Sequence, residues 1–191
     1  MTRLPDGLLE PLPLGLIDFQ VAVSNLTALP DDLDLRWGHP LSILSIEQCQ
    51  LDEFPVALTH LQVKELSLHG NRVRSMKLVK FGADFDKLTT LVLSRMPLRE
   101  LSDMMPVNVR DLRLVSLENT QIVKFPFWAN TSAAMRMSTT VFAFGTPFCD
   151  SLSEHAIAAE YGQHAVISRV KQSSYFHGRL PLDFVTQMRV P

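Results

Sequence analysis

The sequence has few cysteines and almost no net charge. Cys49 and Cys149 are its only cysteines among 191 residues, too few for a disulfide scaffold or a four-cysteine metal site. Its 18 lysines and arginines nearly balance 20 aspartates and glutamates, so the formal net charge is −2 at pH 7. This balance gives no electrostatic reason to expect a nucleic acid or a membrane surface as partner.

Long apolar runs are also missing. A membrane-spanning helix needs about 20 consecutive apolar residues, and charges and prolines interrupt every candidate stretch. We do not expect the apolar N-terminus to be a signal peptide, since Pro5, Asp6 and Glu10 break it up and no clear small-residue cleavage site follows. Two glycosylation sequons, at Asn25 and Asn130, point the other way because they matter only in secreted proteins. We predict no membrane span and favour a cytoplasmic over an extracellular location.

Signatures of catalysis and of cofactor binding are absent as well. No G-x-S-x-G nucleophile motif, G-x-G-x-x-G dinucleotide motif or G-x-x-x-x-G-K phosphate loop occurs. The six histidines show neither H-x-x-x-H nor H-E-x-x-H spacing, so we interpret them as surface residues and not as metal ligands. We predict that the chain is not an enzyme and that it binds no cofactor and no metal ion.

What the sequence does have is a globular composition and an internal repeat. It is 46% apolar and 20% charged, which supplies a core and gives no sign of chain-wide disorder. The dipeptides Leu4-Pro5, Leu29-Pro30 and Phe54-Pro55 recur with their prolines 25 positions apart. Because a fixed period of this length is the mark of a repeat architecture, the repeat decides the fold class.

Each repeat unit carries apolar residues at fixed offsets. Units begin at residues 16, 41, 63, 88 and 112, and the repeated positions follow at offsets 0, 3, 5, 8, 10 and 13, of which offset 8 also takes polar residues. A degenerate sixth unit keeps the frame without the leucines, at Ser138, Val141, Ala143, Thr146 and Phe148. This pattern resembles the leucine-rich repeat family, whose frame is L-x-x-L-x-L-x-x-N/C-x-L. Residues 66–73 are the closest single match.

The resemblance implies an α/β leucine-rich repeat solenoid, with a curved parallel sheet on the concave face and an irregular or short helical convex side. We predict that residues 1–149 form the array, with a partial first unit, about five in-frame units and a degenerate last unit. Residues 150–191 are predicted to form a C-terminal cap and tail, starting with a capping-box helix at Ser151 and Glu154. In the family, the ninth side chain bonds to the neighbouring unit's backbone, and Asn71 has the usual amide there.

Function is expected at the outward strand positions, because neither core packing nor turn geometry dictates them. The resemblance implies a non-catalytic module that binds a protein partner, whose identity the sequence leaves open, on the concave face. The candidate partner-binding residues are Glu47, Glu65, His69, Leu114, Ser116, Glu118, Phe142 and Phe144. The two phenylalanines are candidate anchors, although the sequence equally allows the tail after residue 150 to cover them.

Two other functions stay open on sequence alone. The chain is alternatively a ligand-binding ectodomain fragment of a membrane receptor or secreted protein, which the sequons favour. It is otherwise the scaffold portion of a larger enzyme such as a kinase, although nothing in this chain would carry that chemistry.

The two cysteines are predicted to be free thiols. They occupy units that lie four apart, on the order of 19 Å when strands are about 4.8 Å apart. A disulfide needs Cα atoms within about 7 Å, so Cys49 and Cys149 cannot pair within one chain.

Overall fold

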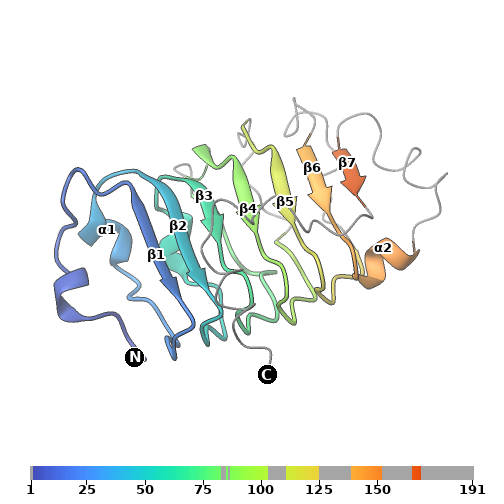
Figure 1. The fold of residues 1–191 in the computed structure, drawn as a ribbon, viewed down its shortest axis with the longest axis horizontal. Coiled ribbons are helices and arrows are strands. Elements are labelled where there is room, and N and C mark those ends of the chain that lie inside the picture. The colour runs from blue at the N-terminus through green and yellow to red at the C-terminus, as the bar shows by residue number, and fades with distance from the viewer. Residues whose placement is uncertain are drawn as a thin grey trace, which may run out of the picture.

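The period-two part of each unit forms a short strand, and the strands make one parallel sheet (Figure 1). The computed structural model describes residues 2–82, 85, 87–102, 111–124, 139–151 and 165–168. Within these ranges the strands are β1 (Asp18–Ala22), β2 (Leu41–Glu47), β3 (Val63–Ser67), β4 (Thr90–Val92), β5 (Leu114–Ser116), β6 (Thr139–Phe142) and β7 (Ala165–Ser168). They lie side by side in chain order, which makes the chain a parallel solenoid.

The strand register follows the predicted frame. Phe19 pairs with Leu44, Leu44 with Leu66, and Leu66 with Leu91, while Leu91 continues the row to Val115. These residues occupy the same offset in consecutive units, and all of them are buried. Since alternate strand residues face opposite sides of a sheet, one apolar position per unit sets both the register and the buried side. The predicted repeat frame is therefore confirmed as the register of the sheet.

Short helical segments precede β1 or lie between consecutive strands. Among the described residues these are η1 (Asp6–Leu8), α1 (Leu33–Trp37), η2 (Val56–Thr59) and α2 (Pro147–Ser151). Proline precedes η1 and η2 and opens α2, because its fixed φ suits the first turn and its missing N–H is not needed there. The described residues contain few and short helical segments.

The N-terminal end of the core is closed by Trp37 of α1. Its ring is buried and lies 4.8 Å from the ring of Phe19 in β1. Its indole Nε1 donates a hydrogen bond to the Leu8 carbonyl at 2.9 Å, so the one polar group of the ring is satisfied. Trp37 thereby joins η1, α1 and the first strand.

The turn after each strand contains a residue in the left-handed backbone region. It has the same position in six consecutive units, with φ between 48° and 71°. The residues are Val23, Gln48, Gly70, Arg95, Asn119 and Gly145. Glycine adopts this conformation without steric cost, whereas a Cβ atom is strained there. Four of the six units adopt this turn geometry without glycine, so the stacking of the units and not the residue type determines it.

Asn71 forms the link between units that the resemblance implies. Its Nδ2 donates to the carbonyls of Ile46 at 2.6 Å and Leu68 at 2.8 Å, and Leu51 N donates to its Oδ1 at 3.3 Å. The hydroxyl of Thr120, at the same position two units later, donates to Leu117 of its own unit. The amide of Asn71 therefore bonds to two units, whereas the shorter hydroxyl of Thr120 bonds to its own unit.

The sheet extends beyond the predicted end of the array at residue 149. β7 pairs with β6 in parallel, with Ala165 opposite Thr139 and Ser168 opposite Phe142. The helix predicted to begin at Ser151 falls in 152–164 and lies outside the described residues. Cys49 and Cys149 are buried and form no disulfide with each other, as predicted.

Candidate functional site: the outward face of the sheet

The strand register gathers the outward side chains into three columns that cross the sheet. The first column holds Asp18, Ile43, Glu65, Thr90, Leu114 and Thr140. The central column holds Gln20, Ser45, Ser67, Val92, Ser116 and Phe142. The third column lies two residues after the central column in each unit, at or just past the end of the strand. It holds Ala22, Glu47, His69, Ser94, Glu118 and Phe144. All eight predicted partner-binding residues fall on this outward face.

Burial varies strongly along these columns. The outward residues of β1, namely Asp18, Gln20 and Ala22, are exposed. Those of the central strands are largely buried, with Ser45 at 1% and Ser116 at 0% exposed. Near β6, Phe142 is half-buried and Phe144 is 38% exposed. In these columns, the most accessible outward residues therefore lie on β1 and near β6.

Accessibility is the part of the site hypothesis that the structure corrects. The outward positions were expected to face solvent, but Glu47, Leu114, Ser116 and Glu118 are buried, while Glu65 and His69 are half-buried. The reason is that a period-two pattern shows which side of a sheet a residue faces, not whether other parts of the chain cover that side. The binding role of these residues stays a prediction.

Buried polar groups on this face bond across the strands. Ser67 Oγ donates a short hydrogen bond to Glu47 Oε1 in the preceding unit. His69 Nδ1 and Ser94 Oγ lie 2.8 Å apart, in hydrogen-bond contact between neighbouring units. A carboxylate taken out of water is costly unless it is bonded, so the Ser67 hydroxyl helps to accommodate the burial of Glu47.

Two hydroxyls in the central column have no hydrogen-bond partner among the described residues. They belong to Ser45 and Ser116, and each oxygen is fully buried. A buried hydroxyl without a partner costs about 1–3 kcal/mol, so such groups call for an explanation. Ser45 was not among the eight candidates, although its place in the same column as Ser116 was visible in the repeat frame.

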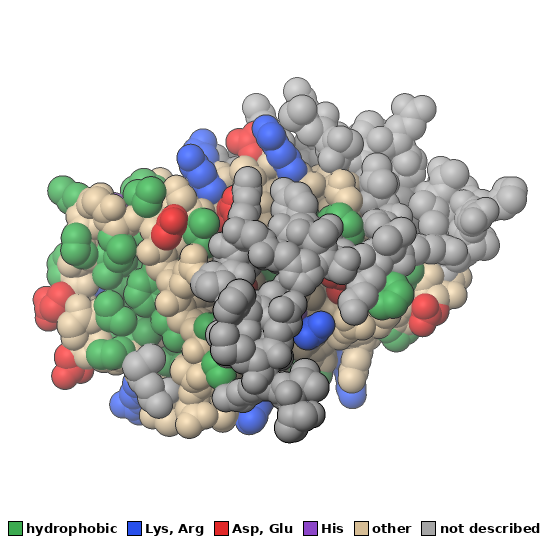
Figure 2. Space-filling view, viewed as in Figure 1, with side chains coloured by type: hydrophobic (Ala, Val, Ile, Leu, Met, Phe, Trp, Pro, Cys, Tyr) green, Lys and Arg blue, Asp and Glu red, His purple; other side chains and the backbone are tan. Residues whose placement is uncertain are grey.

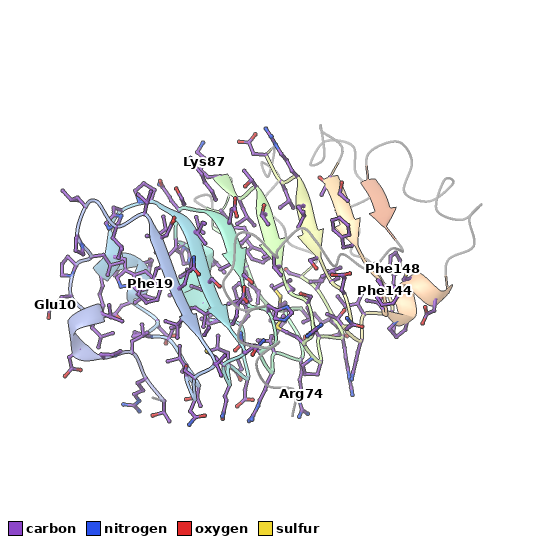
Figure 3. The ribbon with its side chains drawn as sticks, in the orientation of Figure 1. Glu10, Phe19, Arg74, Lys87, Phe144 and Phe148 are labelled. Atoms are coloured by element: carbon purple, nitrogen blue, oxygen red, sulfur yellow. The ribbon has the colours of Figure 1, made fainter. Side chains whose placement is uncertain are left out.

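The C-terminal end of the face offers aromatic surface. Phe144 lies beside α2, where Phe148 is buried in the core (Figure 3). The Phe144 carbonyl accepts a hydrogen bond from Asn119 N at 2.8 Å, which ties its backbone to the preceding unit. An exposed phenylalanine on a fixed backbone is a suitable anchor for a partner.

At the opposite end, apolar side chains gather over β1 and α1 (Figure 2). Leu14, Ile17 and Leu35 are the exposed large hydrophobic residues of this region. They come from the segments before β1 and from α1, so this patch lies beside the outward columns and not within them.

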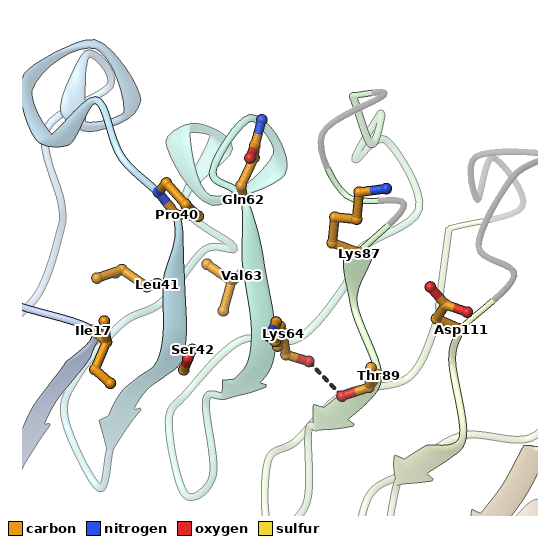
Figure 4. Close-up of a pocket in the computed structure, with 10 residues that line it drawn as sticks. All are labelled: Ile17, Pro40, Leu41, Ser42, Gln62, Val63, Lys64, Lys87, Thr89 and Asp111. Atoms are coloured by element: carbon orange, nitrogen blue, oxygen red, sulfur yellow. Dashed lines mark hydrogen bonds between the residues drawn. The ribbon is translucent and has the colours of Figure 1, made fainter.

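A shallow pocket of about 310 Å³ lies at the edge where the strands begin (Figure 4). Leu41 and Val63 contribute apolar surface, and Lys64 and Asp111 contribute charge. The Thr89 hydroxyl donates to the Lys64 carbonyl at 3.0 Å, which holds two of its units together. Asp111 is the one carboxylate of its described lining.

Metal and membrane sites were also sought in the part of the chain that the structure describes. There, no three His, Cys, Asp or Glu side chains are grouped so that they could hold a metal ion. No helix in those ranges has the length and apolar character needed to cross a membrane.

Comparison with known proteins identifies no family for this chain. None of the models of known protein families matches it, and no curated protein gives a significant match.

Proposed function

We propose that the chain is a leucine-rich repeat protein that acts as a non-catalytic recognition module and binds a protein partner on the outward, concave face of its sheet. The family assignment is supported by the repeat frame, which coincides with the strand register. It is further supported by the amide of Asn71, which bonds to the backbone of the neighbouring unit.

The observation that carries the proposed function is the pair of unpartnered hydroxyls in the central column. Ser45 and Ser116 each place a buried oxygen on the outward side of the sheet, and neither oxygen has a hydrogen-bond partner in the part of the chain that the structure describes. Alanine at these positions would avoid the cost of the unsatisfied groups. A partner that supplies a backbone N–H or carbonyl to each hydroxyl would satisfy its hydrogen bonding. The serines would then have a role in the complex that they lack in the isolated chain.

Binding at the central strands requires the chain to open there. Ser45 and Ser116 are buried by atoms of this chain itself, so a partner reaches them only after those atoms have moved. Phe144, which is 38% exposed, is accessible beforehand. We therefore propose that contact starts at Phe142 and Phe144 and extends toward the central column.

The test starts from affinity purification with the full chain, followed by affinity measurements with the recovered partner. Phe142→Ala with Phe144→Ala should weaken binding by at least about 30-fold, because interface energy concentrates in such anchors. Leu14→Ala with Leu35→Ala is the matched control, since both residues are exposed and apolar but lie outside the columns. Wild-type affinity in a folded phenylalanine variant, together with loss of binding in the control, would place recognition elsewhere.

A second variant separates recognition from stability. Ser45→Ala with Ser116→Ala should raise the melting temperature or leave it unchanged, because no hydrogen bond is lost in the isolated chain. The same variant should bind the partner less tightly. A variant that is more stable and binds equally well would remove the main support for the concave-face proposal.

A further inference from the structure

A groove lies between the return segments of the second and third units. It is lined by residues from 52–60 and 74–82 and has a volume of about 840 Å³. The two segments are joined here, since Gly82 N donates to the Thr59 carbonyl at 3.0 Å. A Cβ atom on residue 82 would lie only 2.8 Å from His60 Nδ1, so the absence of a side chain at Gly82 permits this approach. The groove is separate from the outward columns.

The groove has a firm aromatic wall with exposed apolar side chains beside it. Phe54 and Phe81 meet edge to face with ring centroids 5.9 Å apart, and Phe81 lies 4.5 Å from the ring of Phe85. Leu78 is 91% exposed and Val56 is 58% exposed, and both line the groove. Apolar side chains that cluster in the open beside a preformed hollow mark an interaction surface.

The part of the groove formed by the third unit is cationic. Arg74 and Lys80 line it and are exposed, and neither has an ion-pair partner among the described residues. Figure 3 shows Arg74 at the edge where the strands end, across the sheet from Lys87. Asp52 and Glu53 line the part contributed by the second unit. The charges of the groove are therefore segregated by unit.

Arg99 follows Arg74 in the next unit, and its Nε donates to Gln121 Oε1 at 3.0 Å. Its backbone N–H donates to the Arg74 carbonyl at 2.9 Å, because the two arginines hold the same offset in consecutive units. Glu100 of the same unit accepts a hydrogen bond from Ser75 Oγ at 3.3 Å. The Arg74 guanidinium stays without an ion-pair partner among the described residues, and its geometry suits a carboxylate especially well.

We propose that this groove docks a short acidic segment of another protein. Its bulky apolar side chains pack against Phe54 and Phe81, and its carboxylates lie beside Arg74 and Lys80. A protein segment fits better than a nucleic acid, because a peptide can place single carboxylates on the cationic side only. A nucleic-acid backbone carries a charge at every phosphate and would bring some of them to Asp52 and Glu53.

The test measures binding of labelled synthetic peptides to the full chain by fluorescence anisotropy. One twelve-residue probe combines glutamates with leucine and phenylalanine, the second has lysines for the glutamates, and the third has serines for the apolar residues. Only the first probe should bind. Its Kd should rise at least about 10-fold in Arg74→Glu with Lys80→Glu, as expected when charge complementarity is reversed.

Controls keep the proposal falsifiable. Lys64→Glu with Arg113→Glu changes the same number of exposed cations at the strand-start edge and should leave the Kd unchanged. If the Arg74 and Lys80 variant is unstable, Leu78→Ser replaces it, because that side chain is almost fully exposed. Equal binding of the glutamate and lysine probes, or no binding of the acidic probe, overturns the proposal. Tighter binding of a single-stranded DNA oligonucleotide through Arg74 also overturns it, in favour of a nucleic-acid site.

Discussion

The side-chain amide of Asn71 donates to the carbonyl of Ile46, one repeat unit earlier, at 2.6 Å. It also donates to the carbonyl of Leu68 in its own unit, and its oxygen accepts from Leu51 N. All four residues are buried. Because each unit of a solenoid is stabilised mainly by its neighbours, this side chain couples the second unit to the third.

Replacement of Asn71 should therefore be costly. We expect Asn71→Ala to lower the free energy of unfolding by about 2–4 kcal/mol, because it leaves buried backbone groups without partners. Urea denaturation of the full chain measures this change. Asn25→Ala is the control, since its hydrogen bond to Gln50 is exposed and its loss should cost less than about 0.5 kcal/mol. Equal costs for the two variants would contradict the coupling role of Asn71.

Backbone conformation predicts opposite effects of alanine at Gly70, a left-handed turn residue, and at Gly15, which is not one. Gly70 has φ of 71°, and a Cβ atom there would lie 3.1 Å from Gln48 Cγ, so Gly70→Ala should destabilise the chain by about 1–2 kcal/mol. Gly15 has ordinary φ and open space around it, so Gly15→Ala should be neutral or stabilise by up to about 1 kcal/mol. Thermal melting of both variants checks the sign, and a stabilising Gly70→Ala would mean that this turn is wrongly described.

The exposed pair of Arg36 and Asp32 predicts a shifted titration. Arg36 Nη2 lies 2.7 Å from Asp32 Oδ2, and this hydrogen bond holds the pKa of Asp32 below its ordinary value of 3.8. The carboxylate form is favoured in the folded state, so its small contribution to stability is present above that ordinary pKa and fades as the pH falls through the folded one. In an NMR titration, Arg36→Gln should raise the pKa of Asp32 and Arg3→Gln should not. An unchanged pKa in Arg36→Gln would show that the pair does not form in solution.

Both thiols should be unpaired and protected. Cys49 and Cys149 are buried, so a thiol reagent should react slowly with the native chain. In denaturant without reductant it should count two thiols per chain. A count of zero, with a peptide linking the two cysteines, would contradict the stacking of units that keeps them apart.

The apolar residues at fixed offsets of the repeat predicted most of the fold, because the same residues determine which side of the sheet is buried and how the strands pair. Leu44 and Leu66 mark the same offset, and the structure pairs them directly. β7 was not predicted as a strand of the sheet, because Ala165–Ser168 carries no leucine and falls outside the repeat frame. The turn conformation was not predictable from residue type either, since Gln48 and Arg95 adopt a geometry that usually requires glycine.

For the candidate site, the sequence predicted which side of the sheet each residue faces but not how exposed it is. The frame placed Glu47 and Ser116 on the outward side, but their burial depends on contacts between distant parts of the chain, which periodicity does not contain. The groove beside Phe54 and Phe81 was missed for a similar reason. Phe54 belongs to the repeat frame, but Phe81 follows the last frame position of its unit, and the two rings meet only when the units stack.

Photo-crosslinking from position 144 tests the proposed recognition most directly. The full chain would carry benzoylphenylalanine in place of Phe144, or, as the control, in place of Leu35, which is also exposed but lies in α1. Recognition on the outward face predicts a discrete crosslinked protein from position 144 and none from position 35, and Ser45→Ala with Ser116→Ala should reduce its yield. A partner that crosslinks from position 35 and not from position 144 would contradict the proposal that this face is the recognition surface.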